Sequence, residues 1–153
     1  MILFVSCAAA VFLLDLISKH IVSSGMELGS TVSLVPGVFD LTYIVNKGAA
    51  WGILSGKQML LQVFTAVLMV VLTAYAAAKR KTLGKPELLA LGLIVGGGLG
   101  NFISRVSEGQ VVDFFNIHVI PVFNVADIGI TVGCVLLVIA ALFSDRKKDA
   151  DGK

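Results

Sequence analysis

The chain has 153 residues, of which 57% are hydrophobic and 14% are charged. A soluble domain carries about 25% charged residues. The apolar residues here are also grouped into blocks, so the composition argues against a soluble protein and predicts one compact membrane domain. The net charge of +2 is too small to indicate binding to nucleic acid.

Four apolar blocks are long enough to cross a membrane, since about 20 apolar residues span the hydrocarbon core as a helix. We therefore expect an all-α membrane protein, a four-transmembrane-helix bundle in a single domain. Residues from about 146 to 153 are polar and are predicted to be disordered. The four blocks cover residues 2–22, 59–78, 88–106 and 126–143.

The segment between the first two blocks, residues 23–57, has a different pattern. Apolar and polar residues alternate over residues 31–35 and 39–44, and Pro36-Gly37 between them is a turn signal. This predicts a small extracytoplasmic β-hairpin or sheet. Trp51 follows among small residues, and its amphipathic ring is expected at a membrane interface.

Small residues recur at four-residue spacing in two of the blocks. Gly92, Gly96 and Gly100 share one helix face in the third block, and Gly129 and Gly133 form a second such face in the fourth. Small side chains let helix backbones approach closely, so both faces are predicted to pack on neighbouring helices.

The connection between the second and third blocks is basic, and so is the segment after the fourth block. By the positive-inside rule both segments are cytoplasmic. An even number of spans then places Met1 in the cytoplasm too, and the two longer connections face outward. The basic residues are Lys79, Arg80, Lys81, Lys85, Arg146, Lys147 and Lys148.

Under this orientation, the strongly polar residues embedded in apolar sequence all fall near the outer membrane surface. Solvated helix ends explain part of this distribution, but they explain neither an inner layer without such residues nor Asn and Arg inside the spans. Ionisable residues within a membrane are candidates for function. The residues are Asp15, Asn46, Asn101, Arg105, Asp113, Asn124 and Asp127.

Helical spacing predicts two local pairs within this layer. Asp15 and Lys19 are four residues apart, so they share a helix face and can form an ion pair. Asn101 and Arg105 have the same spacing near the outer end of the third block.

Asp113 and Asp127 are the only carboxylates in the otherwise apolar stretch from Val111 to Thr131. Carboxylates held close together in a low-dielectric site cannot both ionise, so they share one proton. One can then act as a general base on water while the other acts as an acid. From these two residues alone, the alternative is that Asp113 is a solvated loop residue and Asp127 a helix cap.

The sequence contains no motif for nucleophilic catalysis with a histidine base and none for metal binding. His20 and His118 are the only histidines, and neither lies beside a nucleophile in an activating motif. No metal-binding spacing occurs, and Cys7 and Cys134 are isolated within apolar blocks. We therefore expect no metal and no other cofactor.

Five short motifs that carry these polar residues follow one another along nearly the whole chain. They are Asp15-Leu16-Ile17-Ser18-Lys19, Asn46-Lys47-Gly48-Ala49-Ala50-Trp51-Gly52, Gly100-Asn101-Phe102-Ile103-Ser104-Arg105, Val111-Val112-Asp113-Phe114 and Phe123-Asn124-Val125-Ala126-Asp127. In this order they resemble the motifs of the bacterial lipoprotein signal peptidase family, signal peptidase II. The combination is specific, although each motif alone is weak.

The resemblance implies an aspartyl endopeptidase of the bacterial cytoplasmic membrane that removes the signal peptide from prolipoproteins. Cleavage is implied just before a Cys that already carries diacylglycerol, so the expected partners are that peptide and membrane lipid. The resemblance also implies that Asp113 and Asp127 are the catalytic pair, and a monomer is expected. Substrate-binding or supporting roles are implied for Asn46, Asn101, Arg105, Asn124 and Asp15, with Asp15 bracing the fold.

Two features depart from the family pattern. Ser104 stands where the family usually has Asp, in Gly-Asn-x-Ile-Asp-Arg, which affects a supporting hydrogen bond and not the two carboxylates. The segment between Asp113 and Asp127 is also short for the family, so the geometry of its loop is left open.

A protein of another class remains an alternative, namely a small proton- or ion-coupled membrane transport subunit, because acidic residues in spans also mark ion paths. Such a path should cross the membrane, whereas the inner halves of the blocks lack polar residues. A purely structural membrane subunit would not require Asn101, Arg105 and both aspartates together.

Overall fold

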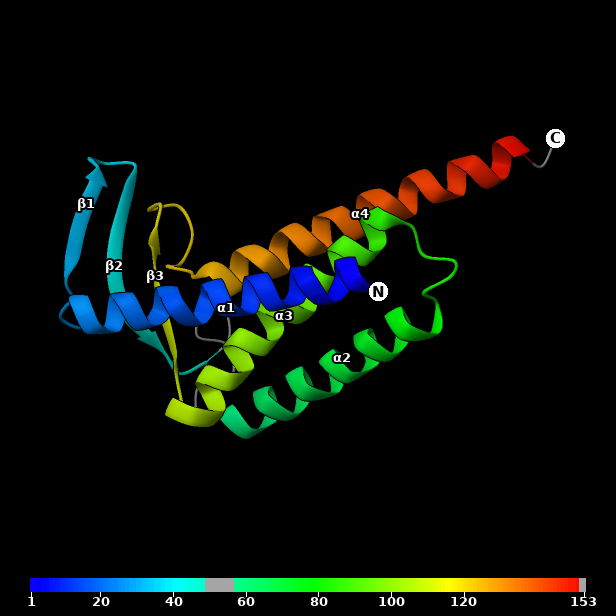
Figure 1. The fold of residues 1–153 in the computed structure, drawn as a ribbon. Coiled ribbons are helices and arrows are strands. Elements are labelled where there is room, and N and C mark those ends of the chain that lie inside the picture. The colour runs from blue at the N-terminus through cyan, green and yellow to red at the C-terminus, as the bar shows by residue number, and fades with distance from the viewer. Residues whose placement is uncertain (49–56, 152–153) are drawn as a thin grey trace.

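The computed structural model describes residues 1–48 and 57–151, so Trp51 and its predicted interfacial position lie outside the described residues. Within these described residues, four helices run side by side, and a three-stranded sheet lies at one end of them (Figure 1). The elements are α1 (Ile2–Gly25), β1 (Thr31–Val35), β2 (Phe39–Asn46), α2 (Gln58–Ala78), α3 (Lys85–Glu108), β3 (Val111–Asn116) and α4 (Val125–Asp151).

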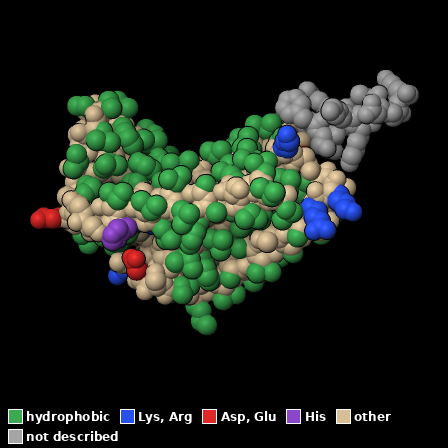
Figure 2. Space-filling model, viewed as in Figure 1, with side chains coloured by type: hydrophobic (Ala, Val, Ile, Leu, Met, Phe, Trp, Pro, Cys, Tyr) green, Lys and Arg blue, Asp and Glu red, His purple; other side chains and the backbone are tan. Residues whose placement is uncertain are grey.

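Helix α3 is the centre of the bundle, because it packs against α1, α2 and α4. Much more of its surface is buried than that of the other three helices. Each of the four helices is long and apolar enough to cross a membrane, which confirms the predicted four-span bundle. Exposed apolar residues such as Ile17 on α1 and Val70 on α2 cover the outside of the bundle (Figure 2).

The glycine faces lie where helix backbones meet, as predicted. A Cβ atom on Gly96 would collide with the backbone of Ala8 on α1, and one on Gly133 of α4 would collide with the carbonyl oxygen of Ala90 on α3. Glycine at these positions therefore allows α3 to contact both neighbours at backbone distance.

The sheet is antiparallel with the strand order β1-β2-β3. The predicted hairpin is present: Val38 N–H donates to the Val35 carbonyl oxygen at 2.9 Å, and Gly37 has a φ of 73°. Positive φ at this position, after Pro36, is typical of a type II turn.

Strand β3 was not predicted, since strands were expected only within residues 23–57. Its Val and Phe residues favour a strand, and its pairing with β2 sets Ile44 opposite Asp113. Helix α4 also differs from the prediction, because it continues to Asp151 through residues predicted to be disordered. Ala, Arg and Lys in that segment are good helix formers.

A small apolar cluster joins the sheet to the bundle. Val22 near the end of α1 packs with Val112 and Phe114 of β3, and all three are buried. The strand that carries Asp113 is therefore fixed against a helix at the sheet end of the molecule.

The two ends of the bundle differ in charge. The N-terminus, the α2–α3 connection and the end of α4 lie at the end opposite the sheet (Figure 1). Most of the Lys and Arg side chains visible in Figure 2 gather at that same end. The basic segments and the sheet thus lie at opposite ends of the membrane-spanning helices.

Candidate active site

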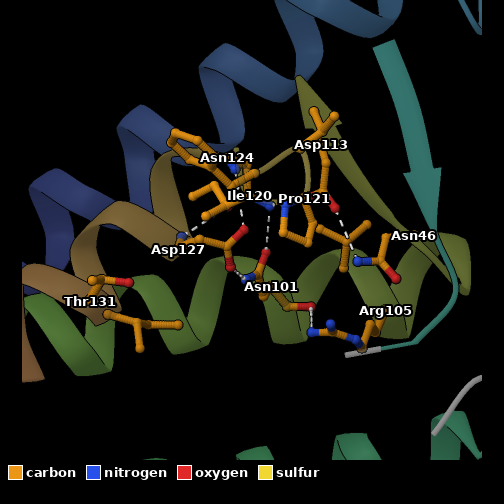
Figure 3. Close-up of a pocket in the computed structure, with 13 residues that line it drawn as sticks. Asn46, Asn101, Arg105, Asp113, Ile120, Pro121, Asn124, Asp127 and Thr131 are labelled. Atoms are coloured by element: carbon orange, nitrogen blue, oxygen red, sulfur yellow. Dashed lines mark hydrogen bonds between the residues drawn. The ribbon is translucent and has the colours of Figure 1, made fainter. Parts of the chain in front are cut away.

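Asp113 is buried on β3, with 2% of its surface exposed. Asn46 on the paired strand β2 donates from Nδ2 to Asp113 Oδ2 at 3.1 Å, and Asn124 Nδ2 donates to Asp113 Oδ1 at 2.6 Å (Figure 3). Burial and then the negative charge of Asp127 raise the pKa of Asp113 to about 6, against the lowering effect of both amide donors. Asp113 is therefore not the solvated loop residue of the alternative interpretation.

Asp127 lies in the first turn of α4, three residues after Asn124, the residue that immediately precedes the helix. Asp127 N–H donates to Asn124 Oδ1 at 3.0 Å, and Asn124 N–H donates to Asp127 Oδ2 at 3.2 Å. This reciprocal pair has the geometry of a capping box. The helix-cap interpretation of Asp127 is thus correct, but it leaves the other carboxylate oxygen for a second contact.

Asn101 on α3 makes that second contact, and its hydrogen bonds show which way its side-chain amide is oriented. Its Nδ2 donates to Asp127 Oδ1 at 2.8 Å. Its Oδ1 accepts from Lys19 Nζ at 2.8 Å and from Asn124 Nδ2 at 3.2 Å. Because a Lys ammonium can only donate, Lys19 forces the oxygen of Asn101 toward α1 and its NH₂ group toward Asp127.

The predicted ion pair between Asp15 and Lys19 is present, with 2.6 Å between Asp15 Oδ2 and Lys19 Nζ. Asp15 is fully buried, and its Oδ1 accepts from the backbone N–H of Ala126 at 2.9 Å. Asp15 therefore ties α1 to the start of α4, where Asp127 lies. A Cβ on Gly100 would collide with this carboxylate, so only glycine leaves room for it.

Arg105 lies one turn after Asn101 on α3 and bonds to backbone oxygens. Its guanidinium donates to the carbonyl oxygens of Asn101 at 3.2 Å and of Gly48 at 3.0 Å. Within the described part of the chain no carboxylate forms an ion pair with it. A positive charge is thus held beside the two aspartates without neutralising either of them.

Ser104 is buried on the side of α3 that faces Lys19. Its hydroxyl donates to the carbonyl oxygen of Gly100 at 3.1 Å and accepts from Lys19 Nζ at 3.3 Å. The hydroxyl therefore supports the ammonium that orients Asn101.

Six of the seven predicted polar residues line one cavity of about 380 Å³. Asp15 does not line the cavity but bonds to the start of α4, and Lys19 does not line it but bonds to Asn101. Lys19 was predicted only as the ion-pair partner of Asp15. Apolar residues that the sequence analysis did not single out form the opposite wall, between β3 and α4. The cavity is lined by Asn46, Asn101, Arg105, Val111, Asp113, Ile120, Pro121, Val122, Phe123, Asn124, Asp127, Ile130 and Thr131.

The donor set at this cavity does not form a metal site. Over residues 1–48 and 57–151, no three His, Cys, Asp or Glu side chains lie close enough together to hold a metal ion. The cavity instead offers two carboxylates, three carboxamides and one guanidinium, which can bind a peptide and move protons.

Comparison with known proteins gives a consistent result. The family model described as signal peptidase (SPase) II matches residues 7–143. A lipoprotein signal peptidase of Staphylococcus haemolyticus (strain JCSC1435) is 36% identical over 150 residues, which is 95% of this chain and 91% of that protein.

Two solved structures, both described as bacterial membrane enzymes, share the fold. One, at 2.3 Å resolution, has a TM-score of 0.88 and 34% identity, and the match covers 95% of this chain and 90% of that one. The other, at 1.9 Å resolution, has a TM-score of 0.82 and 35% identity over 91% of this chain and 92% of that one.

Proposed function

The chain belongs to the signal peptidase II family of multi-pass bacterial membrane proteins, and we propose that it is an aspartyl endopeptidase that removes signal peptides from prolipoproteins. The observation that supports this most is the pair of carboxylates on β3 and α4. Asp113 and Asp127 line one cavity, and Asn124 donates to both carboxylates, from its side-chain amide to Asp113 and from its backbone N–H to Asp127. The proposed substrate carries diacylglycerol on a Cys, and the bond cleaved lies just before that Cys.

The two carboxylates take different roles in this proposal. We assign the shared proton and the role of acid to Asp113, which is buried and lies beside the charge of Asp127, two effects that raise its pKa to about 6. Asp127 is only half-buried, accepts hydrogen bonds from Asn101 and from a backbone N–H, and acts as the base.

Hydrolysis then needs one water molecule and the one shared proton. Asp127 removes a proton from water as the oxygen attacks the scissile carbonyl carbon, and Asp113 gives its proton to the carbonyl oxygen. In the second step the C–N bond breaks, Asp127 returns its proton to the leaving amine, and a hydroxyl of the tetrahedral intermediate returns a proton to Asp113. The two carboxylates end in their starting states.

Arg105 and the amides position the substrate and the carboxylates. The guanidinium of Arg105 faces the cavity and donates to the carbonyl oxygen of Gly48. This bond fixes Gly48, two residues after the end of β2. The charge of the guanidinium favours the negative charge that develops on the substrate oxygen during attack.

The surroundings suit a substrate that is partly lipid. The apolar wall of the cavity can contact acyl chains or apolar peptide side chains, while the polar side faces the scissile bond. We place the sheet end at the outer membrane surface and both termini in the cytoplasm, because the basic segments lie at the opposite end. The protein acts as a monomer in this proposal.

The alternative, a proton- or ion-coupled transport subunit, finds less support. The site residues surround one cavity beside strand β3, at the sheet end of the bundle, and the family match is to a peptidase.

The test is a cleavage assay with purified protein in detergent micelles. Two synthetic prolipoprotein peptides are compared, one with diacylglyceryl-Cys and one with an unmodified Cys, and mass spectrometry identifies the products. We expect cleavage before the lipidated Cys, with a strong preference for the lipidated peptide and no effect of a chelator. Cleavage elsewhere, equal use of both peptides, or loss of activity in chelator that a divalent ion restores would contradict the proposal.

A further inference from the structure

The apolar wall of the cavity, which we define as residues 120–123, is hydrogen-bonded to β3 at its far end, residue Phe123. Phe123 N–H donates to the Phe115 carbonyl oxygen at 3.0 Å, and Phe115 N–H donates to the Phe123 carbonyl oxygen at 2.8 Å. The rings of Phe115 and Phe123 also pack, with centroids 5.7 Å apart. This end of the wall is therefore joined to β3 by an isolated antiparallel bridge.

His118, two residues before the wall, holds the chain that leads into it. Its Nε2 lies 2.9 Å from Asp40 Oδ2 on β2, and its backbone N–H donates to Asn116 Oδ1 at 2.9 Å. His118 has a φ of 61°, a left-handed conformation that residues other than Gly, Asn and Asp seldom adopt. A backbone held in this way persists only where other contacts fix it.

The carboxylate of Asp40 bonds to His118, and one of its two oxygens has no partner in the part of the chain that the structure describes. Its side chain is buried, with 8% of the residue exposed, and its Oδ1 has no hydrogen-bond partner among the described residues. A buried carboxylate is costly unless it is paired, so the contact with His118 is favourable for Asp40 as well as for the loop.

The stretch between these two ends has little support of its own. Val119 is 78% exposed and Ile120 is 48% exposed. Within the described part of the chain, no hydrogen bond from residues 119–122 to the sheet is present. The side chain of His118 is therefore the tie that connects this stretch to β2.

We propose that His118 and Asp40 form a positioning pair that sets the place of the cavity wall and so determines how tightly the cavity holds its substrate. The inference rests on the proposed function, because it concerns the same cavity. Neither residue contacts Asp113 or Asp127, which are held separately by Asn46, Asn124 and Asn101. Loss of the pair therefore weakens substrate binding and leaves the chemical step largely intact.

The variants separate the side-chain tie from the backbone conformation. His118→Asn keeps a residue that adopts left-handed φ readily, but its side chain is too short to reach Asp40. His118→Gln has a longer side chain with an N–H donor that can replace the tie. Asp40→Ala removes the partner, and His20→Asn is the control, because His20 is an exposed histidine on α1 away from the wall.

Initial rates with the lipidated peptide give kcat and KM for each variant. We expect His118→Asn to raise KM roughly tenfold, the effect of one charge-assisted hydrogen bond, with kcat within about twofold of wild type. His118→Gln should recover most of the affinity, and His20→Asn should match wild type. The double variant His118→Asn/Asp40→Ala should be no worse than the worse single variant, since both remove the same contact.

A second measurement does not depend on the substrate. A spin label on Val119→Cys, in a background with Cys7→Ala and Cys134→Ala, reports the mobility of the chain between His118 and the wall. We expect mobility to rise in His118→Asn and to return toward wild type in His118→Gln. Unchanged mobility in His118→Asn, or an unchanged KM, would overturn the positioning pair, whereas failure of the wild type to cleave the lipidated peptide would refute only the proposed function.

Discussion

Neutral amides contact the two carboxylates directly, while the nearest ammonium acts from a distance. Asn46, Asn124 and Asn101 each donate to Asp113 or Asp127. Lys19 is paired with Asp15 and donates to Asn101, which in turn donates to Asp127. Direct contact with a cation would strongly favour full ionisation of both carboxylates, whereas amide donors leave room for one shared proton.

The first prediction concerns Asn46 and the pH dependence of cleavage. The proposed mechanism requires the proton on Asp113, so kcat/KM should fall as pH rises through its pKa of about 6 in the free enzyme. Asn46 donates to Asp113 and favours its ionised form. Asn46→Ala should therefore raise this pKa further and move the fall of kcat/KM to higher pH.

The matching control for Asn46 is Ser107→Ala, because Ser107 is exposed on α3 and bonds only to backbone oxygens of its own helix. Its profile should coincide with that of wild type. A shift of the Asn46→Ala profile to lower pH, or none at all, would mean that Asp113 is not the residue whose proton is lost.

Ser104 provides a second prediction at the residue scale. Ser104→Ala removes one acceptor from Lys19, which keeps Asp15 and Asn101 as partners. The cleavage rate should fall by no more than roughly tenfold, as expected for one hydrogen bond. Ser104→Asp should be tolerated, because a second cavity of about 100 Å³ lies beside Ser104 and Lys19. If Ser104→Ala were as inactive as Asp113→Asn or Asp127→Asn, Ser104 would have to contact the substrate or the attacking water directly.

At the scale of elements, the parts of the fold with local signals could be predicted from the sequence. The four helices follow from apolar blocks and the hairpin from Pro36-Gly37. Strand β3 has no comparable signal, because its pairing with β2 joins residues far apart in the chain and its apolar residues continue an apolar stretch.

The site shows the same division between local and distant information. The ion pair of Asp15 and Lys19 follows from spacing along one helix. The apolar wall and the contact of His118 with Asp40 depend on how the sheet folds, and isolated residue types do not reveal them. For Asp127 the two interpretations proved compatible, since one carboxylate group both caps α4 and lines the cavity.

The close contact of α3 with α1 gives a prediction for stability. Gly96→Ala places a methyl group against the backbone of Ala8, which cannot move without shifting α1. Overpacking of this kind should lower the free energy of unfolding by about 1–3 kcal/mol. Gly25→Ala is the control, because nothing lies within 4 Å of a Cβ at that position. Thermal unfolding in detergent measures both, and equal stability of the two variants would contradict the packing described for α3.

At the scale of the whole molecule, the two ends of the bundle have separate properties. The sheet, the cavity and the polar network share one end, and the termini and the basic α2–α3 connection share the other. A protein built in this way has a defined direction in the membrane, since positive residues are retained in the cytoplasm.

The predicted direction can be measured with single cysteines in a background with Cys7→Ala and Cys134→Ala. Lys81→Cys lies in the α2–α3 connection and should be protected from an impermeant thiol reagent added outside intact cells. Ser33→Cys lies on the exposed strand β1 at the sheet end and should be labelled. Labelling of position 81 from outside, with position 33 protected, would reverse the orientation.

The central claim is that Asp113 and Asp127 act together on the peptide bond. The most direct measurement is the rate of cleavage of the lipidated peptide by Asp113→Asn and Asp127→Asn at equal amounts of folded protein. Each variant should lose roughly a thousandfold or more, the scale of a lost general acid or base, while Glu108→Gln, which removes an exposed carboxylate at the end of α3, should keep the wild-type rate. Substantial cleavage by either aspartate variant would contradict the claim.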